Sequence, residues 1–242
     1  NGELDEWEAA MPTDALRDDD DDDDDEKEAA YAAEALERLC EAVSGEAVAR
    51  LMLPQLEPML SPSAPWASRH AALVAIATVC EHGASVIEPH LTQIVGMLTG
   101  AMGAPEARLR WAACYALALL CDEFPPLPEK MHEQLAPLLV TAMADASARV
   151  RAAACLATVN LVQGMEEAAL LEHAQGLLGA LHTIVSASGG PNYVAFAACS
   201  ALAVVCAGLE DAPNSPMGSA YAAFMPHLAA RLGPAVSVRY GK

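Results

Sequence analysis

Acidic and amide side chains recur at one spacing along this sequence. Glu81 and Asp122 are 41 residues apart, and Asn160 lies three residues before the next position of that spacing, Gln163. Carboxylates pair with Lys or Arg, and a carboxamide can bond a peptide backbone whatever its sequence. These residue types fit the binding of a basic peptide segment. The alternative is that Glu81 and Asp122 are solvated turn residues and that Asn160 caps a helix end.

No arrangement typical of catalysis accompanies these residues. The segment MHEQLA (131–136) begins like a zinc-protease helix but lacks a second His four residues after the first. The seven His and seven Cys are scattered, and none form pairs at metal-ligand spacing. Neither a G-x-S-x-G elbow nor a G-x-x-x-x-G-K loop is present. The sequence therefore predicts a protein that is not an enzyme and has no metal and no cofactor.

The element that positions these residues is a repeat. Arg69, Arg110 and Arg151 begin three similar segments, and Ala195 begins a fourth; the spacings are 41, 41 and 44 residues. The acidic positions follow the arginines by twelve residues. The aligned segments are RHAALVAIATVC (69–80), RWAACYALALLC (110–121), RAAACLATVNLV (151–162) and AFAACSALAVVC (195–206).

Each segment has apolar residues at helical intervals, and a second apolar stretch follows it after a turn. These second stretches, each predicted to be a helix, are 86–102, 131–143, 170–185 and 220–232. Two amphipathic helices cannot bury their apolar faces alone, so neighbouring pairs must stack. A period of 41–44 residues with two helices is typical of HEAT or armadillo repeats. The sequence predicts an all-α, right-handed α-solenoid. The cysteines lie in Ala/Leu/Val runs, which predicts reduced, buried thiols.

The repeats divide the chain into predicted units. Two further segments extend the pattern upstream, and residues 235–242 correspond to the start of a truncated repeat, which suggests an interior fragment of a longer protein. The predicted units are an acidic disordered insertion (1–28) and HEAT repeats at 29–65, 66–104, 105–146, 147–190 and 191–234.

One unit resembles the HEAT pattern most closely. Pro137 lies in its second helix, Asp145 follows eight residues later and Arg151 six residues after that. Pro137 can bend a helix, Asp145 can cap the next helix, and Arg151 can bond to that aspartate or to its counterpart in the adjacent repeat. All three are expected to shape the fold.

Most of the acidity lies near the start of the chain. The net charge is -20, and residues 1–50 contribute -15 of it, with 19 acids against 4 bases. Adjacent like charges repel and bury nothing, so the aspartate run is expected to be solvated. Such acidity disfavours direct binding of nucleic acid and favours a basic protein partner. The run consists of Asp18, Asp19, Asp20, Asp21, Asp22, Asp23, Asp24 and Asp25.

Membrane insertion is not expected. The longest apolar stretch, from Ala195 to Leu209, is shorter than the roughly 20 residues that span a bilayer. The first residue is Asn1, and no signal-peptide pattern follows it.

The order of features resembles the importin-β (karyopherin-β) family, and within it the importin-5 and importin-4 branch. The resemblance rests on a Trp in an acidic context (LDEW, 4–7), the acidic stretch, and the later strings at matching separations. These are W-x-x-R-H-A-A-L (66–73), R-x-A-A-C-x-A-L (110–117), F-M-P-x-L (224–228) and R-Y-G-K (239–242).

The resemblance implies a nuclear import receptor that shuttles between cytoplasm and nucleus through the nuclear pore. Basic cargo, ribosomal-protein-like or histone-like, would bind the inner face at Glu81, Asp122 and Asn160. FG-repeat nucleoporins would bind grooves between outer helices, Ran-GTP would release cargo, and the aspartate run would contact Ran or cargo. The sequence departs from the family at Gln163 and Ala207, where acids are expected. The alternatives are a HEAT scaffold or assembly factor, of the phosphatase-scaffold type, and a HEAT subunit of a larger enzyme complex.

Overall fold

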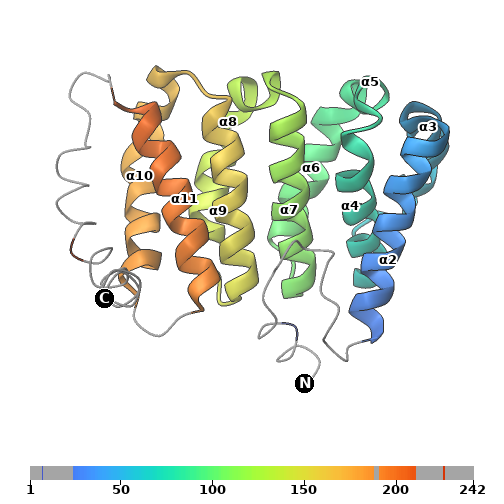
Figure 1. The fold of residues 1–242 in the computed structure, drawn as a ribbon, viewed down its shortest axis with the longest axis horizontal. Coiled ribbons are helices and arrows are strands. Elements are labelled where there is room, and N and C mark those ends of the chain that lie inside the picture. Colours follow the sequence, from blue (N-terminus) through green and yellow to red (C-terminus); the bar gives the residue numbers. More distant parts are fainter. Residues whose placement is uncertain (1–6, 8–23, 188–190, 211–225, 227–242) are drawn as a thin grey trace, which may run out of the picture.

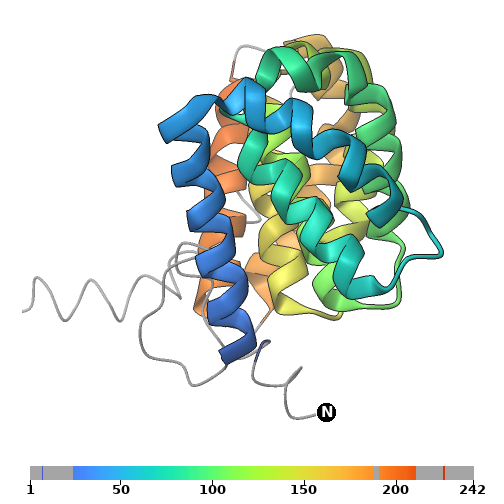
Figure 2. The same cartoon turned by 90° about the vertical axis from the view of Figure 1, so that its right-hand side faces the viewer.

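The helices of this chain stack in two layers. The computed structural model describes residues 24–187 and 191–210, together with Trp7 and Pro226. Among these residues every regular element is a helix. Figures 1 and 2 show a front layer, here called the first layer, and a second layer behind it. The protein is therefore an all-α solenoid, as the repeat predicts.

The first layer holds the helices that begin each repeated segment. They run in the same direction and lie side by side (Figure 1). This layer consists of α2 (Asp24–Leu39), α4 (Trp66–Cys80), α7 (Ala107–Glu123), α9 (Ala148–Gln163) and α11 (Asn192–Gly208).

The second layer holds the intervening helices. It consists of α3 (Gly45–Met59), α6 (Leu91–Met102), α8 (Pro126–Ala142) and α10 (Glu167–Ser186).

Alanines let the helices of the first layer approach closely. Ala112, Ala113 and Ala116 of α7 are fully buried between its neighbours α4 and α9. Larger residues such as Leu117 and Leu161 fill the space between the two layers and are also fully buried. Burying one such leucine contributes about 1.5–3 kcal/mol. The core is therefore continuous along the stack.

The cysteines belong to this core. Six of the seven are buried, Cys199 is partly buried, and all are free thiols. Burial raises the pKa of Cys80, Cys114, Cys121 and Cys155 to about 12. These thiols stay protonated and unreactive, as expected for small apolar core residues.

Three helices begin or break where the apolar pattern did not indicate. Helix α2 begins at Asp24 rather than near residue 29. Helix α8 begins at Pro126 rather than near residue 131, because a proline fits the first position of a helix. The stretch 86–102, expected to be one helix, consists of α5 (Ala84–Ile87), a 3₁₀ segment η2 (Glu88–His90) and α6. Pro89 has no N–H to continue an α-helical ladder there.

A single residue forms the turn between α2 and α3. A π-helical segment, η1 (Cys40–Ser44), ends α2, and Ser44 then adopts an extended backbone and accepts a hydrogen bond from the Ala47 N–H. Gly45 follows, and a Cβ there would collide with the carbonyl oxygen of His82 in the next repeat. Glycine is therefore required by close approach of two backbones.

The division into repeats remains a prediction. Helix α8 packs more extensively on α9, which follows it, than on α7, which precedes it, and the same preference joins α6 to α7. The predicted boundaries pair each first-layer helix with the helix after it. The predicted second helix of the unit 191–234 and the segment 235–242 lie almost entirely outside the described residues, which include only Pro226 there.

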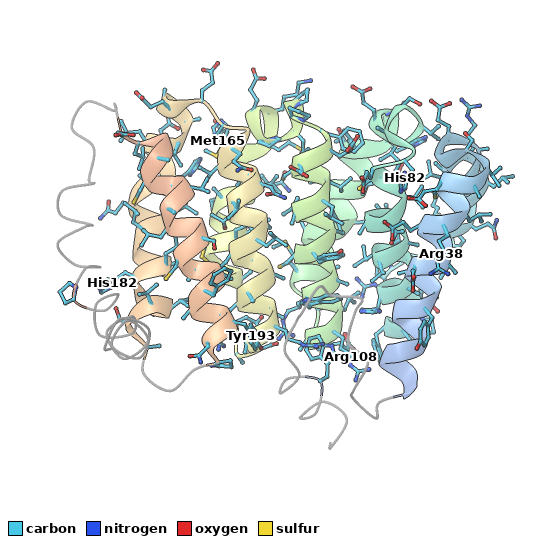
Figure 3. All side chains as sticks on the ribbon, in the orientation of Figure 1. Arg38, His82, Arg108, Met165, His182 and Tyr193 are labelled. Carbon is cyan, nitrogen blue, oxygen red and sulfur yellow. The ribbon has the colours of Figure 1, made fainter. Side chains whose placement is uncertain are left out.

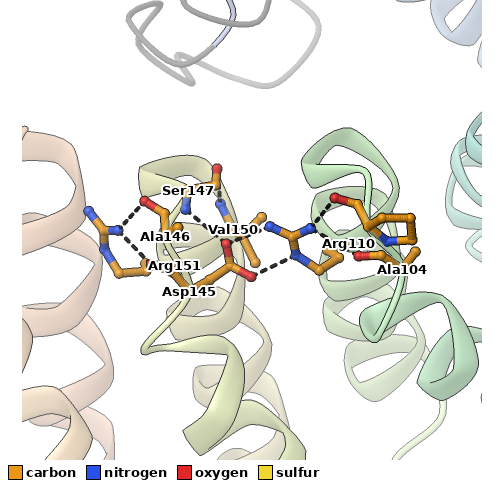
Figure 4. A network of polar contacts seen from close by, with 8 residues as sticks. Ala104, Arg110, Asp145, Ala146, Ser147, Val150 and Arg151 are labelled. Carbon is orange, nitrogen blue, oxygen red and sulfur yellow. Dashed lines mark hydrogen bonds and ion pairs between the residues drawn. The ribbon is translucent and has the colours of Figure 1, made fainter.

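An ion pair links two neighbouring first-layer segments (Figure 4). Arg110 donates from Nε and Nη2 to the two carboxylate oxygens of Asp145, at 2.7 and 2.8 Å, and from Nη1 to the carbonyl oxygens of Ala104 and Pro105. Arg151 instead donates to the backbone carbonyl oxygen of Asp145. The carboxylate thus bonds the arginine of the preceding repeat.

Asp145 also orders the turn before α9. Its Oδ1 accepts a hydrogen bond from the Ser147 N–H at 2.8 Å, and Ser147 is the residue that caps α9, by accepting from the Val150 N–H. Burial acts to raise the pKa of Asp145, but the hydrogen bonds from Arg110 and from Ser147 outweigh it and hold the pKa below its usual value. Pro137 lies inside α8, as predicted.

Candidate functional site

Carboxylates gather at the carboxyl-terminal ends of α4 and α7. Glu81 follows the last residue of α4 and Asp122 lies in the last turn of α7; both are exposed. Glu123, the last residue of α7, lies near both. Burial raises the pKa of Glu123, and the charges of Glu81 and Asp122 raise it further, while His82 acts to lower it. The structure thus brings two of the three predicted residues into one patch, here called the acidic patch: Glu81, Asp122 and Glu123.

Glu123 was missed by the sequence comparison. The repeat alignment selects only the position twelve residues after each arginine, and Glu123 is one residue beyond that position. The signal available was the adjacent pair Asp122–Glu123 at a helix end. Because the last turn of a helix can present consecutive residues to a neighbouring helix, both carboxylates of such a pair are candidates.

Asn160 lies beside this patch but is partly committed to the fold. Its Nδ2 donates to the Ala118 carbonyl oxygen of α7 at 2.9 Å, one helical turn before Asp122. This hydrogen bond joins α9 to α7. Asn160 therefore neither caps a helix end nor leaves its whole amide group for a ligand. The side-chain oxygen of Asn160 is the atom that suits a further bond to a peptide N–H.

The patch stops at α9. Gln163 ends α9 and Gly164 follows it; a Cβ at Gly164 would collide with the Pro128 ring of the second layer. At the end of α11, Ala207 stands where an acid was expected, and Gly208 lies against Leu170. Close packing at Gly164 and Gly208 favours small residues there, whereas Gln163 and Ala207 are themselves exposed, so packing does not account for the missing acids.

The charges of α4 and α7 are opposite to those that stabilise helices, whereas α2 of the same layer has the usual arrangement, with acids in its first turn and Arg38 in its last turn. Acids are normally favourable at the amino-terminal end of a helix and bases at the carboxyl-terminal end, by about 0.3–1 kcal/mol each. Here α4, α7 and α9 have no acid in the first turn and no base in the last turn. Arginines lie near their amino-terminal ends instead: Arg69, Arg108, Arg110, Arg149 and Arg151.

The two ends of the layer therefore differ in charge. Figure 3 shows Arg108 at one end of the first layer and His82, next to Glu81, at the other. The helix dipoles add to this difference, because all these helices run in the same direction. The acids at the carboxyl-terminal ends of α4 and α7 cost stability, which favours a role in binding over a role in folding.

An aromatic row runs from the amino-terminal end of α4 to the middle of α7, away from the acidic patch. Trp66 meets His70 edge-on at 6.4 Å, His70 stacks on Trp111 at 6.0 Å, and Trp111 stacks on Tyr115 at 5.4 Å with the rings nearly parallel. His70 and Trp111 are 41 residues apart and hold the same position in successive repeats. Further along the layer, Phe196 is 76% exposed. The signal for this row in the sequence is the two i, i+4 aromatic pairs, Trp66 with His70 and Trp111 with Tyr115, which the repeat alignment does not single out.

The predicted acidic run lies mostly outside the described residues. Asp24 and Asp25 begin α2, and Asp18 to Asp23 precede the described part of that helix. The role assigned to the run therefore stays a prediction.

The described residues contain no group of three or more His, Cys, Asp or Glu placed to hold a metal ion. Across those same residues, no helix is both long and apolar enough to cross a bilayer. The chemistry that the acidic patch and the aromatic row can perform is noncovalent binding of a flexible, basic segment.

Comparison with known proteins agrees with the repeat. Residues 66–120 and 107–157 match the model of the HEAT-like repeat. No curated protein sequence matches the chain. The chain is similar to Kap121p bound to the extreme C-terminus of the protein phosphatase Cdc14p, with a TM-score of 0.79 and 23% identity over 95% of this chain. The chain has the fold of a karyopherin solenoid.

Other karyopherin structures give the same result. Kap121p bound to RanGTP matches 93% of the chain with a TM-score of 0.77 and 23% identity. Kap121p bound to Nup53p matches 92% with a TM-score of 0.76 and 24% identity. This chain spans about a fifth of the length of these karyopherins, 21–22%.

Proposed function

We propose that this chain is part of a nuclear transport receptor of the importin-β family, and that it binds basic cargo segments without catalysing a reaction. The karyopherin solenoid fold and the HEAT-like repeats support the family. The order of motifs along the chain supports the narrower assignment to the importin-5 and importin-4 branch.

The observation that carries the proposal is the convergence of Glu81, Asp122 and Glu123 across two repeats. Burial is the main cause of the raised pKa of Glu123, and the repulsion from Glu81 and Asp122 that adds to it is relieved when a cation enters the patch. A Lys or Arg of the ligand supplies that cation, and Asn160 offers an amide to the ligand backbone.

The wider partners follow from the same family. Solved karyopherin structures hold RanGTP, Nup53p and a phosphatase C-terminus. We propose that this receptor takes basic cargo of ribosomal-protein or histone type, releases it to Ran-GTP, and shuttles through the pore. In this proposal the aspartate run, 18–25, contacts Ran or basic cargo.

The second layer offers a place for the proposed FG-repeat contact. A pocket of about 300 Å³ lies between α3 and α6 and is lined by Leu53, Pro54, Val86 and Met97 among others. Its lining is mainly apolar, and an aromatic side chain of an FG repeat suits such a groove.

The test compares affinities for a fluorescent Lys-rich peptide. We expect Glu81→Lys with Asp122→Lys, in the full chain, to weaken binding at least tenfold at physiological salt. The matched control is Glu133→Lys with Glu172→Lys, which changes the net charge equally at two exposed second-layer positions. The control should lose less than threefold, through long-range attraction alone.

Two outcomes contradict the proposal. Unchanged affinity in the first variant removes the acidic patch as the binding site. Equal losses in both variants show that only net charge matters. The first variant should be as stable as the wild type or more so, since Lys at a helix carboxyl-terminal end is favourable. A lower melting temperature would therefore point to a scaffold role for these residues.

A further inference from the structure

Trp7 is buried against the amino-terminal end of the first layer. Its side chain is only 3% exposed, although it lies far along the chain from the residues that cover it. Its ring meets Trp111 edge-on, with centroids 6.3 Å apart and an interplanar angle of 85°. The guanidinium carbon of Arg149 lies 4.7 Å from the Trp7 ring centroid, and that of Arg108 lies 5.8 Å from it.

The surface that receives Trp7 is held in place by the fold. Trp111 stacks between His70 of α4 and Tyr115 of its own helix, which fixes the plane of its ring. Arg149 is 6% exposed, so its position is set by packing rather than by solvent. We call these residues, Trp111, Arg108 and Arg149, the tryptophan cradle.

The cradle suits an aromatic residue with acidic neighbours. Two guanidinium groups over one ring favour the electron-rich face of an indole. Arg108 and Arg149 lie in the first turns of α7 and α9, where the positive end of each helix dipole adds to their charge. The chain supplies the complementary sequence itself: Glu3, Asp5, Glu6 and Glu8 flank Trp7 in GELDEWE.

We propose that the tryptophan cradle is a second binding site, for a tryptophan flanked by acidic residues. In this chain the site is filled by Trp7. An acidic-aromatic segment of another protein binds there only by displacing Trp7. The site is distinct from the acidic patch, which lies at the opposite end of the same helices and takes ligands of opposite charge.

The internal segment has a large advantage over a free competitor. Trp7 is joined to α2, which begins at Asp24, by residues 8–23. A ligand tethered by so short a segment has an effective concentration of about a millimolar. Removal of the Trp7 indole alone should therefore open the cradle to a peptide added in solution.

The test uses the full chain and a fluorescent peptide of residues 1–12, NGELDEWEAAMP. We expect Trp7→Ala to bind this peptide at least tenfold more tightly than the wild type does. In the Trp7→Ala chain, adding Trp111→Ala or Arg108→Gln should weaken binding at least tenfold, and adding Phe196→Ala should not. Phe196 is an exposed aromatic residue of the same layer, on α11, and is the matched control. A peptide with Ala in place of Trp should not bind.

Two outcomes of the peptide-binding experiment would overturn the proposal. Equal peptide affinity in the wild type and in Trp7→Ala overturns the proposal, and so does an equal loss on Phe196→Ala and Trp111→Ala. Arg108→Gln keeps the aromatic core intact, so it decides the matter if Trp111→Ala does not fold by circular dichroism. Because no Lys-rich ligand is involved, failure here leaves the proposed function untouched, and the reverse also holds.

Discussion

Arg110 and Asp145 form a bidentate ion pair between neighbouring repeats. Their side chains are 18% and 12% exposed, and the carboxylate receives two parallel hydrogen bonds from the guanidinium. An isolated exposed ion pair contributes under about 1 kcal/mol, but breaking a partly buried, bidentate pair leaves the remaining charge without a partner. Asp145 also orders the turn that begins α9.

We expect Arg110→Ala to lower the free energy of unfolding by about 2–4 kcal/mol, because Asp145 would stay partly buried without its cation. The control is Arg50→Ala. Arg50 pairs with Glu46 on the same helix at 3.4 Å, and its side chain is 68% exposed. That variant should lose about 0.5 kcal/mol or less in urea denaturation. Similar losses in the free energy of unfolding of the two variants would show that the ion pair between repeats stabilises the protein no more than an exposed pair does.

His70 gives the protein a pH dependence of its own. Burial, aided by the positive charge of Arg108, lowers the pKa of His70 from 6.5 to about 4. The unfolded chain therefore binds a proton at His70 before the folded chain does. The contribution of neutral His70 to the free energy of unfolding is fully present above about pH 6.5. It is lost as pH falls toward 4, by at most about 3 kcal/mol. The pKa of Asp145 is lowered in the folded chain, so protonation of Asp145 reduces the free energy of unfolding only at pH values below the ordinary aspartate pKa of 3.8.

The measurement is the free energy of unfolding at pH 7 and at pH 4.5. We expect His70→Gln to reduce the difference between these two values, because the variant has no imidazole to protonate in the unfolded state. His90→Gln, at an exposed second-layer position, should leave the difference as it is. A wild-type difference that His70→Gln does not change would contradict this assignment.

At the scale of helices, close contact between backbones requires glycine at one position, Gly45, but not at another, Gly96. Gly45 begins α3 against the backbone of His82, whereas no atom lies within 4 Å of where a Cβ would stand on Gly96 of α6. Gly96 is exposed and lies in the middle of a helix, where glycine is about 0.5–1 kcal/mol worse than alanine.

We therefore expect Gly45→Ala to destabilise the protein by about 2–3 kcal/mol, through displacement of α3 from His82. Gly96→Ala should stabilise it by about 0.5–1 kcal/mol. Thermal unfolding of the two variants checks both signs. Equal shifts of the two melting temperatures would mean that the approach of α3 to His82 does not constrain Gly45.

The positions of most helices could be predicted from the sequence, because apolar residues at helical intervals mark each core-facing side. The ends could not. Helix α8 begins at Pro126 and η2 interrupts the stretch before α6, and both depend on proline backbone chemistry rather than on apolar spacing. The single-residue turn at Ser44 depends on a contact with His82, which lies in another repeat.

At the scale of the molecule, the repeat turns positions 41 residues apart into neighbours. That rule predicts Glu81 and Asp122 as one binding surface, and the role of this surface stays a prediction. It could not supply Glu123, which meets them through the geometry of a helix end. Nor could it place Trp7, because the segment around Trp7 is outside the repeat and its contact with Trp111 and Arg149 depends on folding of the chain.

The central claim is that a basic segment binds the acidic patch at the carboxyl-terminal ends of α4 and α7. Carbodiimide cross-linking of a Lys-rich peptide to the full chain, mapped by mass spectrometry, tests it directly, because the reagent joins an amine only to a carboxylate in contact with it. We predict cross-links at Glu81, Asp122 and Glu123. Cross-links at Glu133 and Glu172 of the second layer, or in the aspartate run alone, with none in the patch, would contradict the claim.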